Sequence, residues 1–258
     1  MITLTTGQIE GWIAAWLWPF MRIGACLMVA PVFGAGAVPA RSRLVLAGAL
    51  TLLVAPLLKQ PQVPMFSAQG LIITVQQLLV GIAIGFVLQI VFDALAMGGQ
   101  LLANTMGLSF AFNVDPLRGT GSPVVGQFYT LIATLTFLAL NGHLAIVQAL
   151  VDGFNTLPIS TDGLALEGFH QVALWGTQLF RGALMVALPG VTALLIVNLA
   201  FGVVSRAAPS LNLFAIGFPV TLIGGLLVIL AGLPAMQSGF VRLMHEGFSF
   251  TGTLMGGG

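Results

Sequence analysis

A long apolar run limits most strongly what this chain can fold into. From Gly70 to Ala103 the sequence contains one charged residue, Asp93. A helix needs roughly 20 mostly apolar residues to span a bilayer, and this run is longer than that. It holds too few polar residues to form the water-facing side of a soluble helix. The run therefore predicts a membrane helix.

Composition extends this conclusion to the whole chain. Hydrophobic residues make up 58% of the 258 residues and charged residues 6%, whereas a soluble globular domain carries about 25% charged residues. Such a chain has too few polar groups to cover a surface that faces water, which argues against a soluble protein with a large core. The net charge is +1, and no basic patch indicates binding to nucleic acid.

Six segments are apolar enough to be candidate membrane helices. They cover approximately residues 11–33, 44–58, 70–92 with an extension to 103, 124–140, 172–204 and 211–236. Pro189 removes a backbone donor from the fifth segment, so we expect a kink or break there. The last third should then form a helical hairpin that turns at Arg206–Pro209. Residues 237–258 are expected to be a partly disordered tail.

We therefore expect an all-α, polytopic helical membrane protein with broken helices arranged as hairpins, in a single membrane domain over residues 1–258. The N-terminus lacks the basic start of a cleaved signal peptide, so the first segment is expected to be retained. With six spans, the positive-inside rule places the arginine-bearing loops in the cytoplasm and both termini outside. The spacing of Gly81 and Gly85 favours close approach of two helices.

Arg22 lies inside the first apolar segment, where a charge is costly unless it is paired or reaches a polar path. One interpretation is a contact to another subunit or to a water-filled path. The other is pairing with an acid such as Asp93, or snorkelling to the interface. His143 follows Asn141 at a helix end, where a structural hydrogen bond is expected more often than a proton relay.

The sequence offers no residue set for catalysis. Its histidines, acids and single cysteine are not spaced as metal ligands, and it contains neither a P-loop nor a GxSxG elbow. We therefore expect no enzyme, no cofactor and no metal. A transporter, a channel component and an assembly subunit remain, and the halves cannot be aligned as the repeats of a typical secondary transporter.

Three groups of motifs resemble the FliR/SctT family of type III export-gate proteins. The first group is WPFMR at 18–22, APVF at 30–33 and VPAR at 38–41. The second is MGLSFA at 106–111, VDP at 114–116 and LNGH at 140–143. The third is LP at 188–189, VNLAFG at 197–202, SRAAP at 205–209, Asn212 and IGFP at 216–219. Together they cover nearly the whole chain in order.

The resemblance implies a flagellar export-gate subunit in the bacterial inner membrane, within the basal body. There it would form, with FliP and FliQ, the gated pore through which unfolded flagellar proteins leave the cytoplasm, with FlhB packed against the gate. It also implies a FliP-like portion over 1–170 and a FliQ-like hairpin and tail over 171–258. Family members lie largely outside the bilayer plane, against the six-span expectation. A stand-alone transporter, an intramembrane enzyme and a structural anchor remain alternatives.

The resemblance also gives a role to the connection 105–123, which is apolar at its start and polar at its end. In the family this segment plugs the pore, and an apolar constriction excludes water and ions. The alternative is a loop packed statically under the helices. The plug and gating residues would be Met106, Gly107, Leu108, Phe110 and Phe112. Subunit contacts or structural roles are expected for Arg22, Arg41, Asp93, Asp115, Asn141, His143, Arg206 and Pro209.

Overall fold

The structure, a computed structural model, describes residues 6–36, 38–59, 61, 63–108, 124–207 and 213–256, with side chains except at 6 and 213–216. Within these residues the chain folds into helices joined by turns, and no strand occurs. The expected all-α fold class is therefore confirmed.

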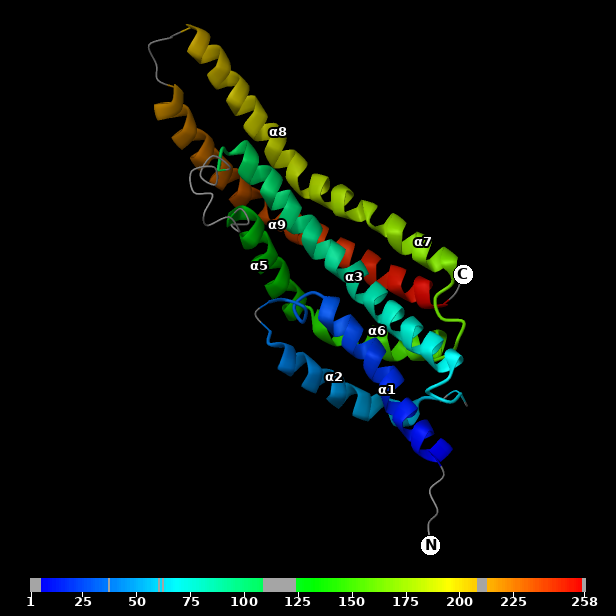
Figure 1. Cartoon of the computed structure of the whole chain (residues 1–258). Helices are drawn as coiled ribbons and strands as arrows, with labels where there is room; N and C mark the ends of the chain where they lie inside the picture. Colours follow the sequence, from blue (N-terminus) through cyan, green and yellow to red (C-terminus); the bar gives the residue numbers. More distant parts are fainter. Residues whose placement is uncertain are drawn as a thin grey trace. The chain divides into compact units, whose positions relative to one another are not determined.

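Eight α-helices and one short 3₁₀ helix follow one another along the described residues (Figure 1). They are α1 (Thr6–Val29), α2 (Ala40–Val54), η1 (Ala55–Leu57), α3 (Ala68–Thr105), α5 (Val124–Ala139), α6 (Gly142–Thr156), α7 (Leu166–Trp175), α8 (Thr177–Ala207) and α9 (Leu213–Gly256).

Five stretches of the described chain are long and apolar enough to cross a membrane: 7–29, 40–57, 68–105, 166–207 and 217–256. The pair of shorter helices α5 and α6 would add a sixth span if both were counted together. These lengths define a multi-pass membrane protein, as the apolar runs predict.

Helix α6 is an element that the sequence analysis did not anticipate. Its buried residues include Ile146, Leu150 and Phe154, which recur every fourth position along one face. Gln148 and Asp152 are exposed on the remainder of the helix. Because polar and apolar residues alternate at helical spacing, the segment looks like a connection by hydropathy and forms an amphipathic helix in the fold.

Two expectations for the last third, a break at Pro189 and a partly disordered tail over residues 237–258, are wrong, whereas a kink at Pro189 stays a prediction. The long run is interrupted at Gly176, between α7 and α8, while α8 continues through Pro189. A proline inside a helix removes one hydrogen bond, and directly after it Gly190 packs tightly against Leu102 and Val228. The residues after 236 are helical to Gly256, because Phe240, Leu243 and Met255 among them are buried.

The chain divides into two compact units that are interleaved along the sequence. Unit 1 comprises 1–90, 141–176 and 245–258, and unit 2 comprises 91–140 and 177–244. Helices α3 and α9 each contribute residues to both units. The FliP-like portion over 1–170 and the FliQ-like portion over 171–258 are defined by similarity to other proteins. The compact units do not test that division, and it stays a prediction.

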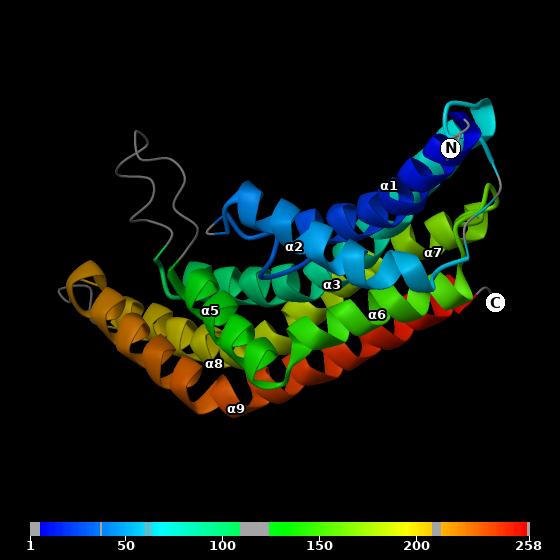
Figure 2. The same cartoon turned by 90° about the horizontal axis from the view of Figure 1, so that it is seen from below.

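In unit 1, α1 packs closely on α3 and alongside α2 (Figure 2). A Cβ atom at Gly81 would collide with the carbonyl of Arg22, and one at Gly85 would collide with the backbone of Cys26. The close approach predicted from these two glycines is confirmed. Further along the same contact, Trp18 Nε1 donates a hydrogen bond to Thr74 Oγ1 over 3.1 Å.

In unit 2, aromatic rings and small residues bring α3, α5, α8 and α9 together. Phe92 makes edge-to-face contacts with Phe137 and Phe240, with ring centroids 5.6 and 5.2 Å apart. Gly99 of α3 lies so close to Gly126 of α5 that a Cβ atom there would be 2.8 Å from its Cα atom. Such contacts leave little freedom between the helices of this unit.

Candidate functional site

The end of helix α3 fixes where the predicted plug segment begins. Gly107 has a φ of +80°, a conformation that glycine adopts without steric cost. The Leu108 N–H donates to the Ala103 carbonyl over 3.0 Å, and the Gly107 N–H donates to the Asn104 carbonyl over 3.1 Å. These two bonds and the left-handed glycine form a Schellman motif, which ends a helix in a defined direction.

Met106 anchors this helix end in unit 2. Its side chain is 1% exposed and fills the space beside Gly225 of α9, where a Cβ atom would be 2.6 Å from the Met106 sulfur. The Asn198 Nδ2 atom of α8 donates a long hydrogen bond, 3.4 Å, to the Thr105 carbonyl. The base of the segment is therefore held by both helices of the α8–α9 hairpin.

The other end of the segment is equally constrained. Helix α5 begins at Val124, and two residues later Gly126 packs against Gly99 of α3. The described residues on either side of 109–123 thus belong to two closely packed helices of unit 2. Leu108 is half-buried, while Phe110, Phe112 and Asp115 lie outside the described residues.

Arg22 occupies a buried polar centre in unit 1. Its Nε donates to Gln77 Oε1 over 2.8 Å, and its Nη1 donates to the carbonyls of Gly153 and Leu157 over 3.1 and 2.9 Å. The guanidinium lies 4.3 Å from the centroid of the Phe154 ring, a cation–π contact. Arg22 thus joins α1, α3 and α6.

This geometry decides between the interpretations of Arg22. The side chain is 0% exposed, so it neither snorkels nor reaches another subunit. Its partners are neutral oxygen atoms and an aromatic ring, and Asp93, the acid expected to pair with it, is exposed. The expected Arg22–Asp93 pair is therefore wrong, because hydrogen bonding to amide oxygens solvates the buried charge instead.

Two donors at this centre are left over. Arg22 Nη2 and Gln77 Nε2 are buried, and neither has a hydrogen-bond partner within the described part of the chain. On a guanidinium, Nε and Nη2 share one edge, which matches the two oxygens of a carboxylate. The Gln77 amide has only one oxygen, which accepts from Arg22 Nε, and its nitrogen cannot accept from Arg22 Nη2. Sequence analysis missed Gln77, although a polar residue inside the apolar run 70–103 was a usable signal.

The remaining predicted residues take separate places. Arg41 is exposed at the start of α2. Arg206 is exposed in the last turn of α8, where the negative end of the helix dipole stabilises a positive charge. Asn141 has a φ of +57° and its carbonyl accepts the N–H groups of Leu144 and Ala145, so it starts α6.

His143 follows on the first turn of α6, and its Nδ1 atom is buried with no hydrogen-bond partner in the ranges that the structure describes. Pro209 lies outside the described residues. The structure therefore does not bring the predicted contact residues together into one cluster.

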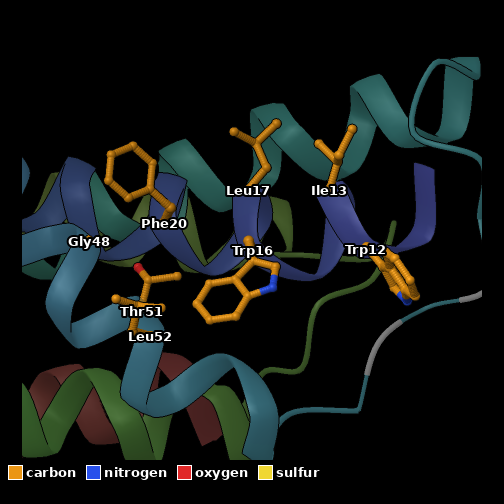
Figure 3. Close-up of a pocket in the computed structure, with 8 residues that line it drawn as sticks. All are labelled: Trp12, Ile13, Trp16, Leu17, Phe20, Gly48, Thr51 and Leu52. Carbon is orange, nitrogen blue, oxygen red and sulfur yellow. The ribbon is translucent and has the colours of Figure 1, made fainter. Parts of the chain in front are cut away.

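An apolar groove lies between α1 and α2 in unit 1 (Figure 3). Its volume is about 600 Å³. Figure 3 shows the Trp16 ring lying between the two helices, next to Thr51 and Leu52. The Thr51 hydroxyl donates to the Ala47 carbonyl, so it presents no free donor. The lining residues are Trp12, Ile13, Trp16, Leu17, Phe20, Gly48, Thr51 and Leu52.

Within the described ranges, no group of three or more histidine, cysteine, aspartate or glutamate side chains is placed to hold a metal ion. Among the polar residues described above, Arg22 and Gln77 bond across helix contacts, and Asn141 starts a helix. Fold and site together therefore define a multi-pass, all-helical membrane protein whose buried polar groups stabilise helix packing.

Comparison with known proteins identifies the family. Residues 13–247 match the family described as bacterial export proteins, family 1. The chain is 39% identical to the flagellar biosynthetic protein FliR of Escherichia coli (strain K12), over 96% of this chain and 95% of the relative. It is 37% identical to FliR of Pectobacterium carotovorum, over 99% and 98%. FliR of Aquifex aeolicus is 30% identical over 87% of each chain.

The chain belongs to bacterial export protein family 1, which confirms the resemblance that its motifs indicate. This is a family of export proteins and not of enzymes.

Proposed function

We propose that this chain is a subunit of the flagellar type III export gate. With FliP-like and FliQ-like partners it forms the pore through which unfolded flagellar proteins cross the bacterial inner membrane at the basal body, and a FlhB-like protein packs against the gate. The names of its relatives and their near-complete coverage of the chain support the flagellar role. The multi-pass helical fold supports a place in the membrane.

The gate proposal rests on the residues that fix the two ends of the segment 109–123. It begins at a Schellman motif held by Met106 and Asn198, and it ends at α5 beside the Gly99–Gly126 contact. A plug must stay in place while the gate is closed, and two anchored ends meet this need. Within the plug, Met106 is an anchor, and the apolar seal starts at Leu108.

The burial of the helices leaves apolar faces that the membrane or neighbouring subunits can cover. In α3, 67% of the most apolar window is buried inside the chain, against 17% in the α7–α8 and α9 spans. The side chains of Ile196 and Leu199 on α8 are 65% and 71% exposed. A transporter that works alone encloses its substrate path with its own helices, whereas a subunit leaves apolar faces for its neighbours.

The plug proposal is tested in the assembled gate with two matched double variants of the same length. Replacing Phe110 and Phe112 by serine removes the apolar seal, so we expect membrane conductance to rise at least tenfold in cells that express the assembled gate without substrate. Replacing both by leucine keeps the seal, so conductance should stay at the wild-type level. Equal conductance of the serine variant and the wild type would contradict the plug.

A second experiment tests the partners. The chain is co-expressed with its FliP-like and FliQ-like neighbours and purified from detergent through a tag on this chain alone. We expect both partners to copurify in a fixed ratio. A well-folded chain that purifies alone and drives substrate uptake in liposomes would support the transporter instead.

A further inference from the structure

The groove between α1 and α2 has the size and chemistry of a lipid-binding site. Its volume of about 600 Å³ lies within the range of about 300–1,000 Å³ that is usual for small-molecule pockets. Its lining is apolar, and the one hydroxyl, on Thr51, is already bonded within α2. The indole N–H groups of Trp12 and Trp16 are the remaining donors of the lining, so the buried part of a ligand in this groove is mainly hydrocarbon.

The groove opens outward from unit 1. Trp12, Trp16 and Leu52 are 61%, 40% and 60% exposed, and both helices that carry the lining are long and apolar enough to cross a membrane. An apolar face of this kind on a membrane helix meets the acyl chains of the bilayer.

Arg41 provides a positive charge on α2, beyond the end of the groove at Gly48, where a lipid head group could bind. Arg41 is exposed in the first turn of α2, and its guanidinium makes no hydrogen bond or ion pair with any residue that the structure describes. It precedes Gly48 by seven positions, which at 1.5 Å per residue is about 10 Å along the helix axis. The neighbouring Arg43 is occupied, because its Nη2 donates to the carbonyls of Ala35 and Val38.

We propose that this groove binds one membrane phospholipid, with an acyl chain along Trp16 and Gly48 and its phosphate on Arg41. An arginine recognises a phosphate by charge-assisted, bidentate hydrogen bonds. The proposal depends on the chain lying in a membrane and not on its role in export. It assigns Arg41 to a lipid instead of the subunit contact that the family resemblance implies.

The four tryptophans of the chain supply the measurement. Trp12 and Trp16 line the groove, whereas Trp18 and Trp175 are 0% and 9% exposed, so a quencher in the groove reaches only the first two. The full-length chain is held in detergent, and phosphatidylglycerol with brominated acyl chains is added in a few molar equivalents. We expect tryptophan quenching that saturates near one equivalent and is absent from the Trp12→Phe, Trp16→Phe double variant.

Gly48→Leu is the variant that blocks the groove. A Cβ atom at Gly48 meets no atom within 4 Å, and leucine favours a helix more than glycine does, so the new side chain fills the groove without disturbing the fold. Gly202→Leu is the matched control, because Gly202 on α8 has the same open surroundings. We expect Gly48→Leu to abolish the saturable quenching and Gly202→Leu to retain it.

Arg41→Gln tests the phosphate contact. We expect the apparent affinity for the brominated phosphatidylglycerol to fall about fivefold, while quenching by a brominated detergent without phosphate is unchanged. Saturable quenching that persists in Gly48→Leu, or quenching that only rises linearly with lipid, would overturn the proposal. Loss of lipid quenching in the wild-type chain after assembly with its partners would also overturn it, because a protein would then cover the groove.

Discussion

At the scale of single residues, the buried Arg22 shows how an apolar chain accommodates a charge. Its guanidinium is bonded to Gln77 and to two backbone carbonyls, and it lies over Phe154. The sequence indicates that a charge at this position needs compensation, because burying it is costly. It does not identify the partners, since Gly153 lies on α6 and Leu157 directly follows that helix, more than a hundred positions away.

Two substitutions of Gln77 should differ in their effect on stability. Gln77→Leu removes the acceptor of Arg22 Nε and leaves a buried donor unpaired, so we expect a loss of about 1.5–3 kcal/mol. Gln77→Glu presents two oxygens to the Nε–Nη2 edge of Arg22, and we expect stability equal to or above the wild type. Thermal unfolding of the purified chain in detergent measures both. An unchanged midpoint for Gln77→Leu would show that the buried centre does not stabilise unit 1.

At the scale of elements, the end of α3 determines the behaviour of the plug segment. The sequence indicates that Gly107 stops a helix. The structure adds that Met106 turns into unit 2 and fills the space beside Gly225, a residue more than a hundred positions later. The sequence analysis predicted Met106 as part of the seal. Its position beside Gly225 instead indicates that it anchors the start of the plug segment.

A pair of substitutions tests this anchor. Gly225→Leu places a side chain in the space of Met106, so we expect it to displace the methionine, loosen the start of the plug and raise the conductance of the assembled gate about threefold or more. Adding Met106→Ala vacates that space, and the double variant should return toward the wild-type conductance. Additive effects of the two changes would contradict the contact, because coupled neighbours are non-additive.

At the scale of the whole molecule, the chain leaves much of its apolar surface uncovered. Along α8 and α9 the exposed large residues include Leu195, Ile196, Leu199, Val203, Leu226, Leu227 and Leu230. Apolar patches of this extent mark contacts with a membrane or with other proteins. We expect the α8–α9 hairpin to contact a neighbouring gate subunit, as the proposed function requires.

A single cysteine introduced at position 199 measures this contact. The native Cys26 is 0% exposed, so it should not react with a maleimide in the folded chain. We expect Leu199→Cys to react in the isolated chain and to react at least tenfold more slowly once the partners are bound. Reaction at equal rates in both states would place α8 outside the subunit contact.

The sequence by itself determined that this protein is helical, multi-pass and of the export family, because apolar length and motifs such as SRAAP at 205–209 are local properties of the chain. It also located the close contacts at Gly81 and Gly85. Three features became visible only in the folded chain: α8 continues through Pro189, Arg22 bonds to Gln77, and Met106 lies against Gly225. Each of these features depends on residues that are distant in the sequence. Hydropathy does not reveal them, because an apolar side chain buried between helices and one facing lipid give the same signal.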